Sequence, residues 1–513
     1  MITLNRFFIL SALLTASAAS ASEGADSMSA VIGRLNCAQS QMWQMTPQAF
    51  VNPAMKQWML PVSVSAIKAS YDRSRLNQPV DIQQGEGSDA WKAGAESYMK
   101  YRTSTLWGAA SYSGGHEFNP VWNESSDLEL IYPYVVADSI GGNIKSETYS
   151  LGGGYADHTD RWAWGATISY VAGLHYRNVD PRPRNVTGRL DISAGGAWLI
   201  PATDYRLGAS VGYMRYKQSA DIEFVNDLAD NRIWHLTGLG TNYDRFSSQG
   251  YSHSYQGHRL SATLGVHPQS GRGLSVTGAM ERFTFDHILT SLNNMPLQSA
   301  AETIWRLEAA WLQPGERHDM AATASVMTGS RQGTENIFGD AAAGIYPQIG
   351  SLTMYRHAMT QASLRLLWQY HPTKSLMVAL TPRALFSRSR QSYADPRRLM
   401  LLSDLTAGLE ASARRNFGPN WNLRASLSAD FTSPLDCNLD LSIDPSAPLG
   451  MQLAEIRRYD ILSKAHHRIE ASMSATRAIS RRYALMLSAS YARQDYSQSI
   501  HSNDFSTSLS FIF

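Results

Sequence analysis

The sequence predicts an all-β protein, an antiparallel transmembrane β-barrel of about eighteen strands that is preceded by a short N-terminal segment. Three observations predict this class. After the first 21 residues, no apolar run approaches the roughly 18 residues that a helix needs to cross a bilayer, and mean hydropathy is negative. Segments of about ten residues instead alternate apolar and polar side chains. The connections between these segments are alternately short and long.

Residues 1–21 have the composition of a cleavable secretory signal. Arg6 gives a basic start, residues 7–14 are apolar, and small residues occupy positions 19–21. This pattern predicts export. A buried N-terminal helix is the alternative, although nothing else in the chain is as apolar. Because no cysteine follows the predicted cleavage site, we expect no lipid anchor at the mature N-terminus.

Residues 22–61 are expected to form a plug-like or hatch-like segment ahead of the barrel. Apolar residues recur at helical spacing between positions 28 and 35. Asn52, Pro53 and Ala54 predict a turn, because an Asn side chain can hold backbone amides and Pro fixes the entry angle. We hypothesise that this turn packs against the inner wall and positions the segment in the lumen. The alternative is a periplasmic tail or a partner-binding arm.

Residues 62–513 are predicted to form the barrel. The candidate strands share a two-residue alternation and are bounded by turn-forming residues. They comprise residues 63–72, 91–101, 104–114, 146–156, 161–175, 187–199, 205–217, 253–266, 273–285, 302–313, 318–328, 359–371, 376–389, 399–415, 421–432, 466–479, 483–493 and 504–513. An even number of strands puts both chain ends on the same, periplasmic, side.

The connections support this strand order independently. Those after even-numbered strands are short, as expected of periplasmic turns: 102–103, 158–160, 201–204, 269–272, 314–317, 372–373, 418–420 and 480–482. Those after odd-numbered strands are expected to be external loops, and the major ones are 115–145, 218–251, 329–358 and 433–465. A soluble two-layer sandwich gives no reason for such an alternation.

The alternation also assigns each residue to a face. In the strand 421–432, Trp421 and Leu427 share a face that we expect to meet lipid, while Ser428 belongs to the opposite, lumenal face. Trp162 and Trp421 each follow a short turn, where an aromatic belt belongs. The barrel must close, because an open edge strand leaves unpaired amides in hydrocarbon.

The final strand combines an aromatic face with a face of small hydroxyl side chains. Phe505, Leu509, Phe511 and Phe513 share the apolar face. The strand resembles the closing strand of bacterial outer-membrane β-barrels, whose C-terminal aromatic strand is the assembly signal. This resemblance implies a Gram-negative outer membrane and recognition by the barrel-assembly machinery.

The lumenal face is predicted to carry charges of both signs. The candidate lining residues are Arg189, Asp191, Arg206, Arg259, Glu281, Arg306, Glu308, Arg365, Arg383, Glu410, Arg424, Asp430, Arg468 and Glu470. One interpretation is a structural network that satisfies buried charge inside the wall. The other is a selectivity lining for a polar solute. A barrel of this size conducts unless something fills it.

Other chemistries have little support in the sequence. The 45 basic and 43 acidic side chains nearly balance, which gives no electrostatic case for nucleic acid. Cys37 and Cys437 can pair in an oxidising compartment, but the sequence does not establish that they do. The adjacent His466 and His467 alternate faces and cannot clamp one metal ion, and we expect no metal or cofactor. The glycines at 152–154 and 195–196 fall in strands, where they permit wall curvature or close packing of the plug.

Two family resemblances add expectations. The turn at Asn52, Pro53 and Ala54 resembles the N-terminal hatch of long-chain fatty-acid (FadL-type) outer-membrane transporters, in which an Asn-Pro-Ala motif precedes the first strand. The match covers residues 52–71, whereas that family has fewer strands and its fatty-acid pocket pattern is absent here. Over its whole length the chain is similar to uncharacterised outer-membrane barrels of Bacteroidota that carry a domain-of-unknown-function label. That resemblance implies location and fold only.

These observations favour an outer-membrane channel or transporter for a small or amphipathic solute, gated or plugged by residues 22–61. The alternative is an accessory surface receptor barrel that binds a ligand or partner protein through its long loops and has no pore activity of its own. The expected partners are outer-membrane lipid, the barrel-assembly machinery and, for a receptor, a TonB-dependent receptor or a surface lipoprotein. An outer-membrane enzyme is the least favoured class.

Overall fold

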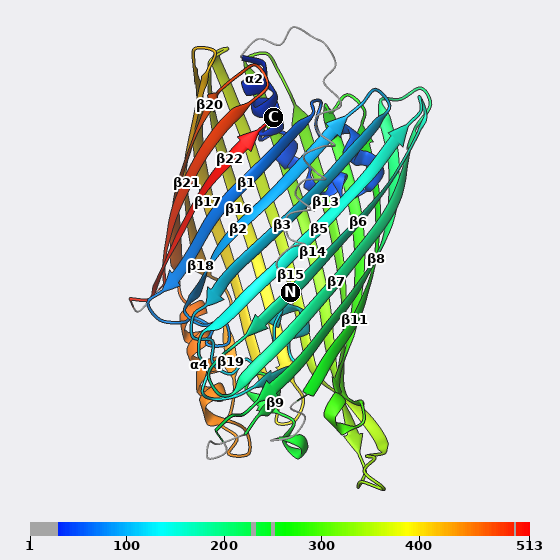
Figure 1. Cartoon of the computed structure of the whole chain (residues 1–513), viewed down its shortest axis with the longest axis vertical. Coiled ribbons are helices and arrows are strands. Elements are labelled where there is room, and N and C mark those ends of the chain that lie inside the picture. Colours follow the sequence, from blue (N-terminus) through cyan, green and yellow to red (C-terminus); the bar gives the residue numbers. More distant parts are fainter. Residues whose placement is uncertain (1–28, 227–231, 248–251, 497–498) are drawn as a thin grey trace, which may run out of the picture.

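The computed structural model describes residues 29–226, 232–247, 252–496 and 499–513. The predicted signal sequence lies outside these residues. Within them, eighteen antiparallel strands form one closed barrel, which confirms the predicted fold class (Figure 1). The barrel strands are β1 (Val64–Leu76), β2 (Gly87–Lys100), β3 (Ser104–Glu117), β5 (Ile144–His158), β6 (Trp162–Tyr176), β7 (Arg182–Leu199), β8 (Tyr205–Glu223), β11 (Ser252–Pro268), β12 (Gly273–Leu289), β13 (Met295–Gln313), β14 (His318–Phe338), β15 (Gln348–Thr373), β16 (Leu376–Tyr393), β17 (Arg398–Phe417), β18 (Trp421–Pro434), β20 (His466–Ala478), β21 (Ala484–Asp495) and β22 (His501–Ile512).

The barrel closes between its first and last strands. β1 pairs with β22 along its length, with Ala66 opposite Ile512. Ser65 and Phe513 exchange backbone hydrogen bonds of 3.0 and 2.9 Å. Every barrel strand therefore has two neighbours, and no open edge faces the membrane. We call the end where β1 begins and β22 finishes the terminal end, and the opposite end the loop end.

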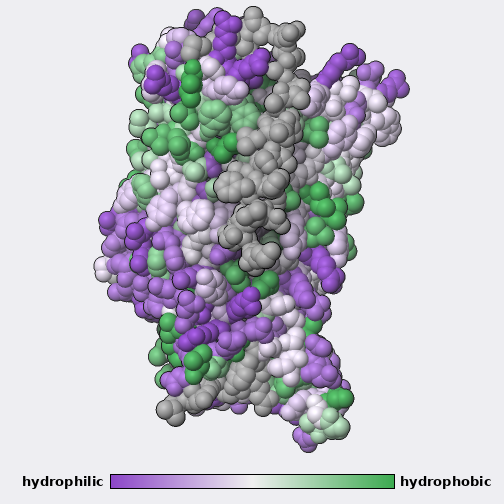
Figure 2. Space-filling model, viewed as in Figure 1, coloured by the Kyte–Doolittle hydropathy of each residue, from purple (hydrophilic) through white to green (hydrophobic). Residues whose placement is uncertain are grey.

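The outer surface of the barrel is apolar, as the alternation predicts. Trp162 is 61% exposed and Leu427 is 56% exposed, both pointing away from the lumen. Ser428 faces inward and is paired in register with Glu410 of β17 and Glu470 of β20. Figure 2 shows hydrophobic side chains across the upper half of the view, with hydrophilic side chains above and below them. None of the described helices is long and apolar enough to cross a membrane.

One predicted loop is wrong. Residues 329–358 were expected to form a long external loop, but β14 continues to Phe338 and β15 begins at Gln348. Only residues 339–347 connect the two strands, and the hairpin projects from the loop end (Figure 1). The alternation persists in this region with Arg331 and Glu335 on the buried side. Because the buried face of β14 is polar here, it lacks the apolar residues that usually indicate a strand.

The remaining long connections fold back over the loop end. They contain α3 (Leu128–Ile131), β4 (Val135–Ala137), β9 (Trp234–Gly238), β10 (Thr241–Asn242), η4 (Asp244–Phe246), β19 (Asn438–Asp440) and α4 (Leu449–Leu462), whereas η5 (Thr290–Leu292) lies in the short turn between β12 and β13. β4, β9 and β10 form a small separate sheet. We call the described residues 118–143, 232–247 and 435–465 the loop cap.

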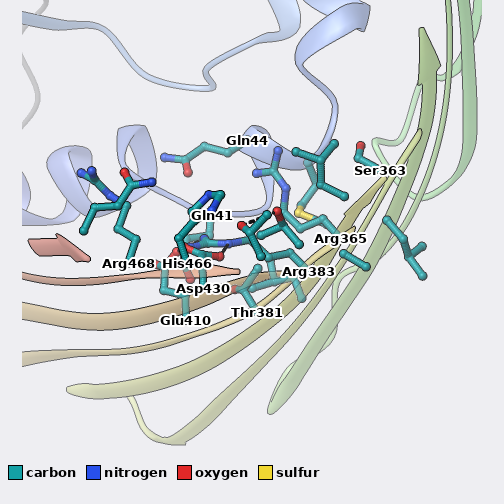
Figure 3. Close-up of a pocket in the computed structure, with 18 residues that line it drawn as sticks. Gln41, Gln44, Ser363, Arg365, Thr381, Arg383, Glu410, Asp430, His466 and Arg468 are labelled. Atoms are coloured by element: carbon teal, nitrogen blue, oxygen red, sulfur yellow. Dashed lines mark hydrogen bonds and ion pairs between the residues drawn. The ribbon is translucent and has the colours of Figure 1, made fainter. Parts of the chain in front are cut away.

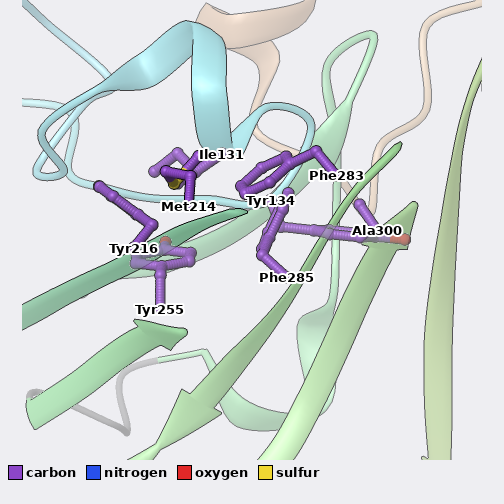
Figure 4. Close-up of a cluster of buried hydrophobic side chains, with 8 residues drawn as sticks. All are labelled: Ile131, Tyr134, Met214, Tyr216, Tyr255, Phe283, Phe285 and Ala300. Atoms are coloured by element: carbon purple, nitrogen blue, oxygen red, sulfur yellow. The ribbon is translucent and has the colours of Figure 1, made fainter. Parts of the chain in front are cut away.

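The loop cap shares an apolar core with the inside of the barrel wall (Figure 4). Ile131 and Tyr134 of the cap are fully buried. They pack against inward-facing wall residues, which are Met214, Tyr216, Tyr255, Phe283, Phe285 and Ala300. An apolar cluster on the lumenal side of a barrel needs a cover from water. The cap provides this cover, so the loop end is not an open mouth on this side.

Residues 29–62, which we call the inner segment, lie inside the terminal end (Figure 1). They form α2 (Ser29–Ala38), η1 (Trp43–Met45), η2 (Pro47–Phe50) and η3 (Pro53–Trp58). α2 contacts β1 and β20, η1 contacts β14, η2 contacts β12, and η3 contacts β3 and β5 to β8. The segment therefore follows the inner circumference of the wall rather than one strand.

Candidate functional site

The turn at Asn52 attaches the inner segment to β7 and β8. The Asn52 side-chain oxygen accepts a hydrogen bond of 2.9 Å from the backbone amide of Ala54 and so caps η3. Its amide nitrogen donates to the carbonyl oxygens of Gly196, at 3.0 Å, and Ala209, at 3.1 Å. One side chain thus shapes the turn and binds two neighbouring wall strands.

Three glycines make room for this turn. A Cβ at Gly195 would overlap the side-chain oxygen of Asn52, and one at Gly208 would lie 3.0 Å from its amide nitrogen. A Cβ at Gly165 would lie 2.7 Å from the carbonyl carbon of Pro53. We call Gly165, Gly195 and Gly208 the Asn52 socket. At these three positions the wall has no side chain, so the turn of the segment lies directly against the wall backbone.

The other end of the inner segment is held by arginines and amides. Arg414 donates to the carbonyl oxygen of Asn36 at 3.4 Å, and Arg424 donates to that of Gln39 at 3.1 Å. These carbonyls belong to the C-terminal end of α2, where the helix dipole favours cations. Asn422 donates to the side-chain oxygen of Asn36 at 3.1 Å. The predicted lining residue Arg424 therefore contacts the segment, and it forms no ion pair with a carboxylate of the described residues.

Two more predicted lining residues contact the inner segment. Glu308 accepts a hydrogen bond of 3.2 Å from the backbone amide of Gln48. The Arg206 guanidinium lies 3.9 Å from the centre of the Trp58 ring. Burial lowers the pKa of Lys56, which lies over the Trp107 ring. The segment is thus docked by single polar and cationic contacts spaced around the wall. It also packs against the wall through three apolar clusters, to which it contributes Val31, Ile32, Leu35, Met42, Met45, Ala54 and Met55.

The other predicted lining residues, except Arg365, form ion pairs in four groups. Arg383 binds Asp430 through two hydrogen bonds of 2.7 and 2.6 Å and lies 3.7 Å from Glu410. Arg468 binds Asp504 at 2.7 Å and Glu470 at 3.4 Å. The remaining pairs are Arg189 with Asp191, and Glu281 with both Arg259 and Arg306. In the part of the chain that the structure describes, Arg365 has no ion pair.

A cavity of about 610 Å³ separates the inner segment from β15 to β21 (Figure 3). Gln41, Gln44 and Met45 line it from the segment. The charged residues that line it from the wall are Arg365, Arg383, Glu410, Asp430 and Arg468, with His466 beside them. The volume is within the range of small-molecule sites, about 300–1,000 Å³. Five predicted lining residues are therefore brought together at one cavity.

Sequence reasoning missed the ion pairs that hold the loop cap. Arg177 binds Glu124 and Asp138 at 2.7 Å each, and these three side chains are at most 2% exposed. Arg331 pairs with Glu302 at 3.1 Å and donates to two carbonyl oxygens of residues 129–132. Residues 124 and 138 were assigned to a loop, where alternation gives no facing. The continued alternation around Arg331 was the available signal.

A second, partly buried charged group joins α4 to the connection between β1 and β2 at the loop end. Glu455 is 1% exposed and lies 3.4 Å from Arg458, which in turn lies 3.7 Å from Asp81. Burial raises the pKa of Glu455, and the charge of Arg458 opposes that rise. These contacts link α4 to the connection between β1 and β2. Along the wall, β20, β21 and β22 lie between the two elements.

The two cysteines do not form a disulfide. Cys37 lies in α2 at the terminal end, and Cys437 follows β18 at the loop end. Burial raises the pKa of the Cys37 thiol, while the nearby Arg414 lowers it. Among the described residues, no group of three or more histidine, cysteine or acidic side chains is arranged to hold a metal ion.

The closed wall, the apolar outer face and the charged lumen together define a membrane-spanning β-barrel whose interior is partly occupied by its own chain. The chain belongs to a family of unknown function, DUF6850, whose model matches residues 53–513. The match begins within the turn that contacts the Asn52 socket. No curated protein matches the chain.

Several solved structures show a distant likeness. A mutant of the ferric enterobactin receptor PfeA from Pseudomonas aeruginosa shares 9% identity over 88% of this chain and 80% of its own, with a TM-score of 0.37. The siderophore receptor PiuA from Acinetobacter baumannii shares 7% over 87% and 82%, with a TM-score of 0.40. The toluene transporter TbuX from Ralstonia pickettii shares 10% over 90% and 92%, with a TM-score of 0.31. At these scores no ligand or site is transferred to this chain.

Proposed function

We propose that this protein is an outer-membrane β-barrel that moves a small or amphipathic solute and is gated by its N-terminal segment. The observation that carries the proposal is how the inner segment is held. Asn52 of the segment binds the wall, and Arg414 and Arg424 of the wall bind the segment, through individual hydrogen bonds. Such bonds contribute only about 0.5–1.5 kcal/mol each, because water replaces them when they break. These polar contacts can break without unfolding the wall, and release of the segment also separates the apolar side chains Val31, Met45 and Met55 from the wall.

The wall behind the segment suits passage of a polar solute. Its charges are arranged as ion pairs of both signs, as in Arg383 with Asp430 and Arg468 with Asp504. Once the segment moves, water reaches these charged groups. The free-energy cost of keeping them away from water then falls. The loop cap covers the other end of the lumen on the side of β8 to β13. A solute path in this proposal therefore crosses two covers, the cap and the inner segment.

Deletion of residues 22–57 tests the proposed gate, with the signal sequence retained. The shortened protein is expected to insert normally and to show a higher single-channel conductance in planar bilayers than the full chain. A shortened β14–β15 hairpin, with residues 339–347 replaced by a tight turn, is the control. This hairpin lies outside the lumen, so the control should conduct like the full chain. A deletion variant that inserts normally without any gain in conductance would refute gating by the segment.

An accessory surface receptor remains the second candidate, and the projecting hairpin favours it. Ile345, Ile349 and Leu352 are more than half exposed at the loop end, beyond the wall. Large apolar side chains grouped on a protruding hairpin are suited to a partner protein. A TonB-dependent receptor or a surface lipoprotein is the proposed partner in that case. This candidate requires that the deletion of residues 22–57 leave the bilayer current unchanged.

A further inference from the structure

The cavity between the inner segment and the wall contains one arginine that lies outside the ion pairs of the wall, although it interacts electrostatically with Glu308. Arg365 of β15 lines the cavity, and neither a hydrogen bond nor an ion pair joins it to any of the described residues (Figure 3). It stands directly opposite Arg383 of β16 in the strand register. Like charges directly opposite each other on neighbouring strands are destabilising. The two carboxylates that pair with Arg383 relieve this repulsion on one side, and an anion at Arg365 would relieve it on the other.

The acidic side chains of the cavity are already occupied. Asp430 receives both of its hydrogen bonds from Arg383, at 2.7 and 2.6 Å. Glu410 lies 3.7 Å from the same guanidinium and accepts a hydrogen bond of 3.4 Å from Gln41. Neither carboxylate reaches Arg365 within 4.0 Å. The cavity therefore holds three arginines and two carboxylates, and both carboxylates pair with Arg383 rather than with Arg365.

The third arginine of the cavity is also bound. Arg468 is held by Asp504 at 2.7 Å, on the side of β22. Its guanidinium is therefore committed to the wall, and Arg365 is left as the available cation. A guanidinium presents its donors in a planar fork that matches a carboxylate or a phosphate. Gln44 lines the same cavity from the inner segment and adds an amide side chain.

Apolar side chains complete the cavity. Leu385 points into the lumen and is 36% exposed, although its strand neighbours on that face, Arg383 and Ser387, are polar. Leu367 and Met45 also line the cavity. A leucine left exposed among polar groups gains free energy when an apolar group covers it. The cavity thus offers a cationic contact and an apolar contact within one volume of about 610 Å³.

We propose that this cavity binds a small organic anion, with its carboxylate or phosphate group at Arg365 and its apolar part against Leu385. The inference rests on the proposed transport function, because the cavity lies between the inner segment and the wall, where a passing solute would be held. It adds the chemical class of the solute to that function. Small neutral compounds of the same size lack the group that Arg365 recognises.

Calorimetric titration of the full-length protein in detergent tests this site with three probes, namely benzoate, its neutral analogue benzamide, and inorganic phosphate. Benzoate is expected to bind at least about 10-fold more tightly than benzamide, since a charged hydrogen bond contributes roughly 1.5–3 kcal/mol. Equal binding of the two, or no binding of benzoate, would overturn the proposal. If phosphate binds as tightly as benzoate, the apolar part of the proposal is wrong.

Variants locate the binding. Arg365→Gln should weaken benzoate binding about 10-fold or more, and Arg365→Lys should restore part of it because the charge remains while the fork is lost. Arg356→Gln is the matched control, because Arg356 lies on the outer face of the same strand and should leave binding unchanged. Leu385→Ser should weaken binding of benzoate but not of phosphate. An equal loss in Arg356→Gln and Arg365→Gln would contradict the site.

The outcome is separable from that of the gating experiment, because binding is measured without any current. If the full chain binds benzoate and the deletion of residues 22–57 does not conduct, the site stands and the transport proposal fails. If the deletion variant conducts and the full chain shows no preference for benzoate over benzamide, transport stands and the anion site fails. Should Arg365→Gln not fold, the comparison of benzoate with benzamide on the unmodified chain still decides the matter.

Discussion

Asn52 holds the inner segment with a side-chain amide that donates and accepts hydrogen bonds at once. No other side chain of similar size can do both in this position. Its nitrogen donates to the carbonyl oxygens of Gly196 and Ala209, while its oxygen accepts from the amide of Ala54. An aspartate would place an acceptor against two other acceptors. The contact also depends on Gly195, because any side chain there meets Asn52. The docking of this turn therefore depends on a few atoms of two residues.

The substitution Gly195→Ala tests this dependence. Its Cβ overlaps the Asn52 oxygen, so we expect the turn to shift and docking to weaken by about 1–3 kcal/mol, the cost of leaving buried polar groups unpaired. Trypsin should then cleave more rapidly after Lys56 in the reconstituted protein, as measured by mass spectrometry. Gly196→Ala is the control, since a Cβ there lies 3.6 Å from the nearest atom. Equal cleavage of the two variants would argue against the contact.

At this scale the sequence predicted the turn and could not predict its partner. An Asn followed by Pro is a local signal, and the structure has Asn52 as the residue that caps η3. The glycines at 195–196 were recognised as strand residues that permit either curvature or close packing. Whether Gly195 or Gly196 faces the segment depends on where a turn some 140 residues earlier in the chain lies. The alternation of side chains does not contain that information.

At the scale of the strand, facing follows directly from the two-residue period. β18 shows it clearly, because Leu427 and Phe431 are more than half exposed on the outside while Ser428 faces two acids across the wall. The strand ends were less predictable. Several strands run beyond the expected ranges at the loop end, where the buried face becomes polar and the apolar signal disappears. Arg331 belongs to such an extension.

Paired substitutions in β18 test the facing. Leu427→Arg places a cation in lipid, which costs about 2–4 kcal/mol near the middle of the membrane, so folding yield in lipid vesicles should fall. Ser428→Arg places the cation between Glu410 and Glu470 and should fold normally. The shift of the folded and unfolded bands in cold gel electrophoresis measures both. The reverse result would mean that the register of this strand is displaced by one residue.

The loop cap was not predicted as a folded unit. Its elements are short, and its stability comes from contacts between distant connections, such as Arg177 with Glu124 and Asp138. Buried ion pairs of this kind have no periodic signature in the sequence. The 14-residue helix α4 has its fully buried positions occupied partly by Gln452 and Glu455, so it also lacks a simple apolar stripe. The conformation of these elements therefore depends on contacts with distant parts of the chain.

For the whole molecule, closure between β1 and β22 is the feature on which all others depend. We propose that the aromatic outer face of β22 is also the signal for the barrel-assembly machinery. Phe511 stacks on Tyr483 with ring centres 5.5 Å apart, and Phe505 and Leu509 are about half exposed on the same face. The even strand count was predictable because turns and loops alternate along the chain.

Loss of the terminal phenylalanine tests the signal. Deletion of Phe513, or Phe511→Asp, is expected to reduce the surface level of the protein severely, with unfolded chain degraded in the periplasm. An acidic residue near the membrane interface costs only roughly 0–1 kcal/mol, so lost stability alone would not produce this effect. Phe417→Asp is the control, because Phe417 ends β17 on the outer face at the same end. Similar surface levels for both aspartate variants would contradict a signal role.

The docking of α2 also has a consequence for the order in which the protein folds. Asn36 is made early, yet its partners Asn416 and Asn422 follow 380 and 386 residues later. Contacts between residues so far apart in the chain form slowly, because the intervening chain must first be ordered. α2 therefore has no wall to bind until β17 and β18 have formed. The lumen is occupied by the earliest described residues only at the latest stage of assembly.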